Sequence, residues 1–104
     1  MKVKTGVALA GLKIYMRKVL TVADHVWTAH GRELVVTSTT DGVHSPGSLH
    51  PYGYAVDLRS RYFTADEIKV VAAELRGLLG TRYDVVVHKT HIHVEYDEIL
   101  NQNL

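Results

Sequence analysis

The segment from residue 91 to residue 96 alternates strictly between polar and apolar residues, and this pattern limits the folds open to the chain. Successive side chains of a β-strand point to opposite faces, so three polar side chains share one face and three apolar ones the other. Such a strand suits a sheet with one solvated and one buried face, which is typical of antiparallel sheets. The polar face would carry His91, His93 and Glu95, and the apolar face Ile92, Val94 and Tyr96.

Three other segments predict strands. Residues 83–88 are rich in valine, and only Lys89-Thr90 separates them from the alternating segment, which predicts an antiparallel hairpin. Residues 33–38 form a short β-branched run. Residues 54–58 alternate, so that Asp57 would face away from the core.

Two helices are expected. Residues 12–31 place apolar side chains at three- and four-residue steps and end at a glycine. Residues 64–67 have the spacing of a capping box, and a second periodic run follows them to Gly80. The sequence therefore predicts a single α+β domain over residues 1–104, with a small antiparallel sheet and two helices packed on one face. The predicted core contains Trp27, Val35, Val56, Leu75, Leu79, Val86, Ile92 and Val94.

The composition limits which partners the protein could attract by charge and which side chains could bind a metal. The 12 basic and 11 acidic residues give a net charge of +1, so there is no general electrostatic reason to bind nucleic acid or an anionic membrane. Charged Lys13 and Arg17 interrupt the apolar residues near the amino terminus, and we expect neither a secretory signal nor membrane insertion. Because the chain has no cysteine, a metal would be bound by histidine and carboxylate.

Several such ligands fall in two short segments. His50 and Asp57 are separated by a turn containing a proline and a glycine, a geometry that can return the carboxylate towards the imidazole. His91 and His93 share one strand face, and a site that already has His50 and Asp57 needs only one of them. Three protein ligands with a fourth position left to water are typical of a catalytic zinc. On spacing alone, a His-x-His pair is also compatible with the exposed face of an edge strand.

The segment from Ser48 to Asp57 resembles the Ser-x-His-x-x-Gly-x-Ala-x-Asp motif of the M15 zinc peptidases. This family includes D-alanyl-D-alanine carboxypeptidases, dipeptidases and phage L-alanyl-D-glutamate endopeptidases. His91-Ile92-His93 resembles its second motif, and the match in order and spacing covers residues 37–97. The resemblance implies a hedgehog-like metallopeptidase fold and a Zn²⁺ ion bound by His50, Asp57 and His93.

The same resemblance implies a substrate and a setting. The substrate would be a peptide of bacterial peptidoglycan that contains D-amino acids. Zinc-activated water would attack the peptide carbonyl and so hydrolyse the peptide bond. The small size resembles the catalytic modules of bacteriophage lysins. We therefore expect a monomeric, phage- or prophage-encoded enzyme that is made in the cytoplasm and acts on the cell wall after release.

The chain departs from the family pattern at the proton-transfer residue. Many members have an acidic base three residues before the last zinc histidine, where this chain has Thr90. His91 is then the first candidate for proton transfer, as in relatives that use the first histidine of His-x-His. Glu95 and His88 are further candidates, although Glu95 could instead orient the ring of His93, since metal-bound histidines commonly have such a partner.

A second departure concerns substrate binding. Many relatives carry an arginine near position 40, which is a threonine here. Arg59 could take that role or could be a solvated surface charge. Ser48 has no aspartate partner for a catalytic triad and would order its loop instead. His25, His30 and His44 have no predicted function.

Two other functions compete with the peptidase. A zinc-containing binding module without turnover is favoured by Thr90 at the acidic position. A metal-dependent nuclease that cuts single-stranded DNA would use a histidine-hydrophobic-histidine strand with a helical tyrosine. Only Tyr15 lies in a predicted helix, the chain lacks a basic stripe, and that function leaves His50 and Asp57 unexplained.

Overall fold

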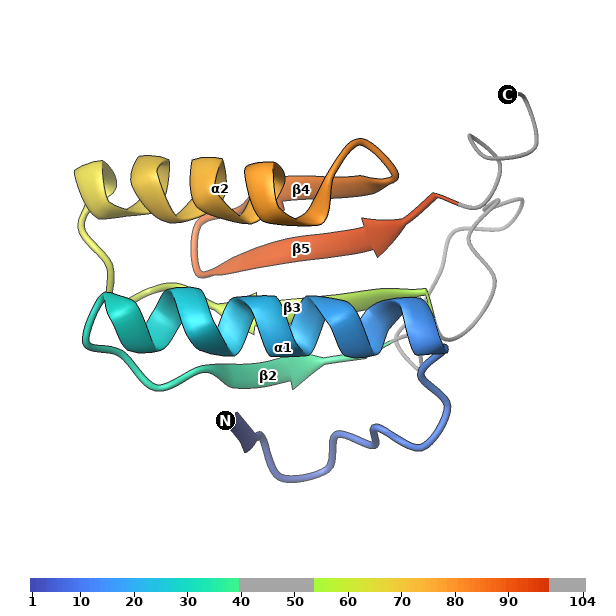
Figure 1. Cartoon of the computed structure of the whole chain (residues 1–104). Coiled ribbons are helices and arrows are strands. Elements are labelled where there is room, and N and C mark those ends of the chain that lie inside the picture. The colour runs from blue at the N-terminus through green and yellow to red at the C-terminus, as the bar shows by residue number, and fades with distance from the viewer. Residues whose placement is uncertain (40–53, 98–104) are drawn as a thin grey trace.

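The computed structural model describes residues 1–39 and 54–97. They form a five-stranded mixed sheet covered by two helices (Figure 1). The strand order across the sheet is β1-β2-β3-β5-β4. The elements are β1 (Lys2–Val3), α1 (Ile14–Ala29), β2 (Val35–Ser38), β3 (Ala55–Arg59), α2 (Ala65–Leu79), β4 (Tyr83–Val87) and β5 (His91–Tyr96).

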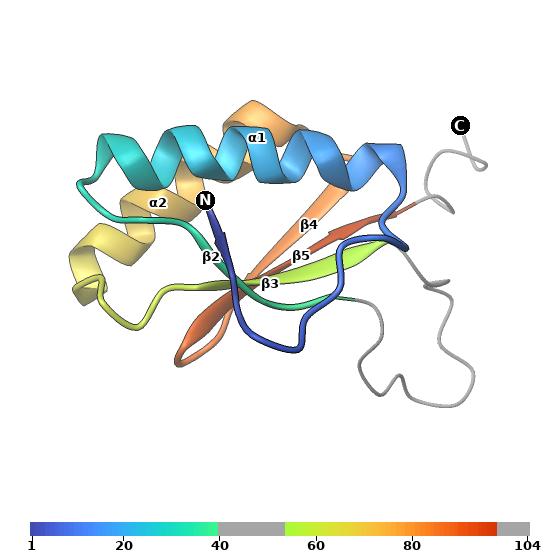
Figure 2. The same cartoon turned by 90° about the horizontal axis from the view of Figure 1, so that it is seen from below.

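The predicted α+β class is confirmed, and both helices lie on the same side of the sheet (Figure 2). Strands β2, β3, β5 and β4 pair antiparallel, as predicted. The sheet is mixed because β1 adds a short edge strand parallel to β2. A strand of two residues is too short to show any periodic pattern in the sequence, which is why it was not predicted.

Local chemistry favours both ends of α2. At the start of α2, the Thr64 hydroxyl accepts from the Glu67 amide at 3.2 Å, and the Thr64 amide donates to the Glu67 carboxylate at 2.9 Å. This reciprocal pair is the predicted capping box. Gly80, with φ of 90°, ends the helix in a conformation that glycine adopts without strain. Neither helix within residues 1–39 and 54–97 is long and apolar enough to cross a membrane.

The core lies between the helices and the sheet. Six of the eight predicted core residues belong to its main cluster, and Val35 is also buried, next to Val36 of that cluster. The prediction for Val86 was wrong, because this side chain is only half-buried and lies on the opposite face of the sheet, paired with His93. Val85 is buried in its place. Three consecutive valines give no alternation from which the face can be predicted. The six confirmed residues are Trp27, Val56, Leu75, Leu79, Ile92 and Val94.

Trp27 ties α1 to the sheet. Its ring is fully buried, and its indole N–H donates to the carbonyl of Arg59 at 2.9 Å, at the end of β3.

We expect Trp27→Phe to lower the free energy of unfolding by about 2 kcal/mol, because the Arg59 carbonyl loses its donor and the smaller ring leaves space. Urea unfolding followed by circular dichroism would measure the loss. The control Tyr15→Phe removes the hydroxyl of a tyrosine that is 41% exposed and should leave the stability near that of the wild type. Equal stability of both variants would contradict the proposed role of Trp27.

Candidate metal centre

The register between β3 and β5 places the predicted site residues opposite one another. Asp57 pairs with His93, and Arg59 pairs with His91. Along β5 the side chains of residues 91, 93 and 95 are half-buried, whereas those of 92, 94 and 96 are buried. The predicted alternation is therefore confirmed, and the polar residues lie on the sheet face that the helices leave uncovered.

The ring of His93 lies between two carboxylates. Its Nδ1 is 2.6 Å from Oδ1 of Asp57, and its Nε2 is 2.6 Å from Oε1 of Glu95. Nε2 of His91 is 3.8 Å from the other carboxylate oxygen of Asp57. Four of the five predicted site residues are thus brought together, although Asp57 and His93 are 36 positions apart in the sequence.

This environment favours the protonated imidazole. The hydrogen bond to Asp57, together with the bond to Glu95 and the negative charges of both groups, raises the pKa of His93 to about 9, although burial opposes the shift. A protonated ring donates one N–H to each carboxylate, so both contacts are satisfied at once.

The raised pKa predicts a pH-dependent stability for the metal-free protein. Since the folded-state pKa of His93 lies above the ordinary value of 6.5, its contribution is fully present below pH 6.5 and is lost as the pH rises through about 9. The loss should be on the order of 3 kcal/mol. Urea unfolding in the presence of a chelator, at pH values from below 6.5 to above 9, would measure it. His93→Gln should flatten the profile, whereas exposed His25→Gln should not; a profile that His93→Gln leaves unchanged would refute the assignment.

The same arrangement suits a zinc ligand set. Zinc binds carboxylate oxygen and imidazole nitrogen, and Asp57 Oδ1 and His93 Nδ1 face one another from adjacent strands. For both atoms to bind an ion, they would have to give up the proton that they share. Glu95 on the opposite ring nitrogen corresponds to the carboxylate that commonly orients a metal-bound histidine. Within residues 1–39 and 54–97, no three side chains are arranged to bind a metal, and the predicted third ligand, His50, lies outside these residues.

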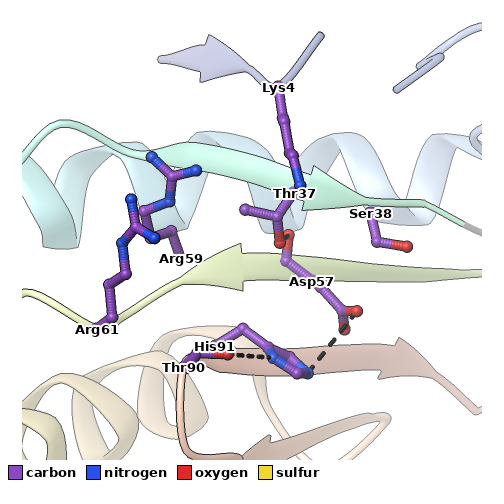
Figure 3. Close-up of a pocket in the computed structure, with 8 residues that line it drawn as sticks. All are labelled: Lys4, Thr37, Ser38, Asp57, Arg59, Arg61, Thr90 and His91. Atoms are coloured by element: carbon purple, nitrogen blue, oxygen red, sulfur yellow. Dashed lines mark hydrogen bonds and ion pairs between the residues drawn. The ribbon is translucent and has the colours of Figure 1, made fainter. Parts of the chain in front are cut away.

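A polar pocket of about 310 Å³ opens beside Asp57 (Figure 3). His91 points into it towards the Asp57 carboxylate, and its Nδ1 lies 3.3 Å from the hydroxyl of Thr90. Three cationic residues also line the pocket, so an anionic group would be favoured there. The lining residues are Lys4, Thr37, Ser38, Asp57, Arg59, Arg61, Thr90 and His91.

The cationic residues were only partly foreseen. For Arg59 the sequence left two alternatives open, a site residue or a solvated surface charge, and in the structure this residue lines the pocket. Lys4 and Arg61 were not predicted. Lys4 reaches the pocket because the Lys4 amide donates to Val36 at 2.9 Å, just after β1, and no signal in the sequence indicated that pairing. Arg61 lies two residues after Arg59, the last residue of β3. This two-residue spacing was the only sequence feature that could have indicated its place in the pocket.

The other histidines separate into two groups. The ring of His88 lies 4.8 Å from that of His91, so this alternative candidate is close to the site. His30 contacts Glu74 at 2.9 Å, and His25 is exposed on α1. Both were expected to have no role in the site, and both lie away from it. The predictions for His44 and Ser48 fall outside the described residues.

The chain was compared with protein-family models, curated proteins and solved structures, and none of the three comparisons returned a match. The functional assignment therefore depends on the site residues and on the motifs in the sequence.

Proposed function

We propose that the protein is a zinc-dependent peptidase that hydrolyses peptide bonds in the stem peptides of bacterial peptidoglycan. The activity would be of the D-alanyl-D-alanine carboxypeptidase or L-alanyl-D-glutamate endopeptidase type. The observation that carries the proposal is the contact between Asp57 and His93 across β3 and β5, with Glu95 behind the histidine ring. These are the two described members of the ligand set that the M15 resemblance implies.

In this proposal each side chain has a distinct task. His50, Asp57 and His93 would hold the ion, and a bound zinc would supply an activated water and polarise the substrate carbonyl. Glu95 accepts from Nε2 of His93, and this contact keeps the imidazole oriented. We therefore assign Glu95 to positioning His93 and leave the proton transfer to another group.

His91 is the proposed proton carrier. It is half-buried in the polar pocket, with Nε2 3.8 Å from the Asp57 carboxylate, so it lies beside a proposed ligand without being one of the three. The Thr90 hydroxyl near Nδ1 steadies the ring and leaves Nε2 facing the site. A group placed in this way can deliver a proton to the leaving amine.

The second candidate is a zinc-containing binding module. Thr90 favours it, because a threonine cannot act as the carboxylate base that many M15 members have at this position. The nuclease is disfavoured by the position of Tyr15. This tyrosine stacks on Tyr96 with ring centroids 4.1 Å apart, on the helix-covered face of the sheet, and His91 and His93 point from the opposite face.

The deciding experiment is digestion of purified peptidoglycan, followed by mass spectrometry of the soluble products. We expect zinc-dependent release of stem-peptide fragments that stops when a chelator is added and resumes when zinc is restored. Release of terminal D-alanine would indicate carboxypeptidase action, and separation of whole stem peptides from the glycan would indicate endopeptidase action. A zinc-loaded protein that binds peptidoglycan and releases nothing would favour the binding module.

A further inference from the structure

A second pocket is lined in part by the turn between β4 and β5. Its volume is about 510 Å³, which falls in the usual range for small-molecule sites. It is lined by residues between 60 and 65, by one side of α2 as far as Arg76, and by the end of β4 with the turn that follows. None of the predicted zinc ligands lines it.

The pocket has an apolar lining. Phe63 and Ala72 are buried, and Ile68 is half-buried against the core. Val87, at the end of β4, is 40% exposed. A ligand with an apolar body would cover this surface and remove it from water.

Cationic side chains surround that apolar lining. Arg61, Lys69 and Lys89 line the pocket, and their side chains make no hydrogen bond or ion pair with any residue in the described part of the chain. Arg76 also lines it and donates to the carbonyl of Val85 at 2.8 Å, which fixes its position. No carboxylate from residues 1–39 or 54–97 lines the pocket, so these charges repel one another with no anion between them.

One buried polar atom adds to this pattern. Ser60 is 2% exposed and lines the pocket, and its hydroxyl oxygen has no hydrogen-bond partner among the described residues. A buried hydroxyl without a partner is costly, and such groups are uncommon in folded proteins. A polar ligand atom or a water molecule in the pocket would satisfy it.

We infer that this pocket binds a small ligand with an apolar body and an anionic head group, such as a short-chain carboxylate. The apolar lining of Phe63, Ile68 and Val87 would hold the body, and the unpaired Lys69 and Lys89 would hold the charge. A purely apolar ligand would leave the repulsion among the cations in place. A charged ligand without an apolar part would leave the apolar lining of the pocket exposed to water.

The pocket adjoins the candidate metal centre without sharing its proposed ligands. Arg61 lines both pockets, and His88 lines this one while its ring lies 4.8 Å from that of His91. The inference does not depend on the proposed function, because none of the groups that carry it binds the ion.

The test is a titration of the whole protein with hexanoate, followed by amide chemical shifts in NMR spectra. Hexan-1-ol and hexylammonium have the same apolar chain with a neutral and a positive head, and they serve as matched probes. We expect saturable shifts at residues 60–72 and 87–89 with hexanoate, at least about fivefold weaker binding of hexanol, and no saturable binding of hexylammonium. Equal affinities for hexanoate and hexanol, no saturable hexanoate shift, or shifts confined to other residues would overturn the inference.

Variants at exposed positions test the cationic and the apolar parts of the pocket lining independently. Lys69→Glu combined with Lys89→Glu should weaken hexanoate about tenfold or more, whereas Lys13→Glu, on the exposed residue before α1, should not. Val87→Glu should abolish binding. Its matched control is Val70→Glu, since Val70 is 49% exposed on α2 and does not line the pocket.

Dispersed amide spectra would confirm that each variant is folded. Unchanged affinity in the double lysine variant would show that the cations do not select the ligand. Asp57→Ala should retain hexanoate binding, because Asp57 does not line this pocket. Evidence against the proposed zinc site would therefore not count against hexanoate binding.

Discussion

Replacing Asp57 or His93 by alanine is expected to lower zinc affinity by at least about a hundredfold, because the proposed three-ligand site would lose one of its bonds to the ion. Asp57 and His93 pair directly across β3 and β5, with Nδ1 of His93 2.6 Å from Oδ1 of Asp57. The same loss is expected for His50→Ala. Glu95→Gln should have a smaller effect, about 10- to 100-fold, because it disturbs only the orientation of the His93 ring.

Zinc content and affinity can be measured together. Plasma emission spectrometry should find about one zinc ion per wild-type chain, and competition with a chromogenic chelator would give the affinities. Asp84→Ala is the matched control, because this exposed carboxylate is paired with Glu95 across β4 and β5 but does not contact His93. It should bind zinc as the wild type does. Wild-type affinity in both Asp57→Ala and His93→Ala would refute the ligand assignment.

The local features of the fold could be predicted from the sequence, and the longer-range ones only in part. The capping box at Thr64 and the alternation of β5 are set by neighbouring residues, so the pattern alone identifies them. The face of Val86 could not be predicted, because three adjacent valines fit either phase of the strand. Strand β1 has only two residues, and its pairing with β2 depends on tertiary contacts.

The candidate site also combines features that a local sequence pattern predicts with features that depend on tertiary contacts. Alternation placed Asp57 and His93 on polar strand faces, but no local pattern gives the register that sets them opposite one another. Their contact depends on a sheet pairing between segments 36 residues apart. Lys4 was missed for a related reason, since it enters the pocket only through the pairing of the amino-terminal segment with β2. Charged side chains on exposed segments carry no periodic signal that would indicate such a position.

His91→Ala is expected to lower the rate of peptide cleavage about 100- to 10,000-fold, the range typical for loss of a positioned proton-transfer group. Zinc content should remain at about one ion per chain, because His91 is not a proposed ligand. The comparison requires both measurements on the same preparation: peptidoglycan digestion for the rate and plasma emission spectrometry for the metal. His25→Ala removes an exposed imidazole from α1 and serves as the control, with no expected change in either quantity.

A rescue experiment separates proton transfer from a structural role. The Thr90 hydroxyl lies 3.3 Å from Nδ1 of His91, so a carboxylate introduced by Thr90→Glu would lie close to the lost imidazole. In the His91→Ala background, Thr90→Glu should recover cleavage by about tenfold, and the pH dependence of the rate should then follow a carboxylate. Loss of both zinc and cleavage in His91→Ala would make His91 a ligand. An unchanged cleavage rate would leave it as part of the pocket wall, and the proton would then have to pass through another group, of which His88 is the nearest described histidine outside the ligand set.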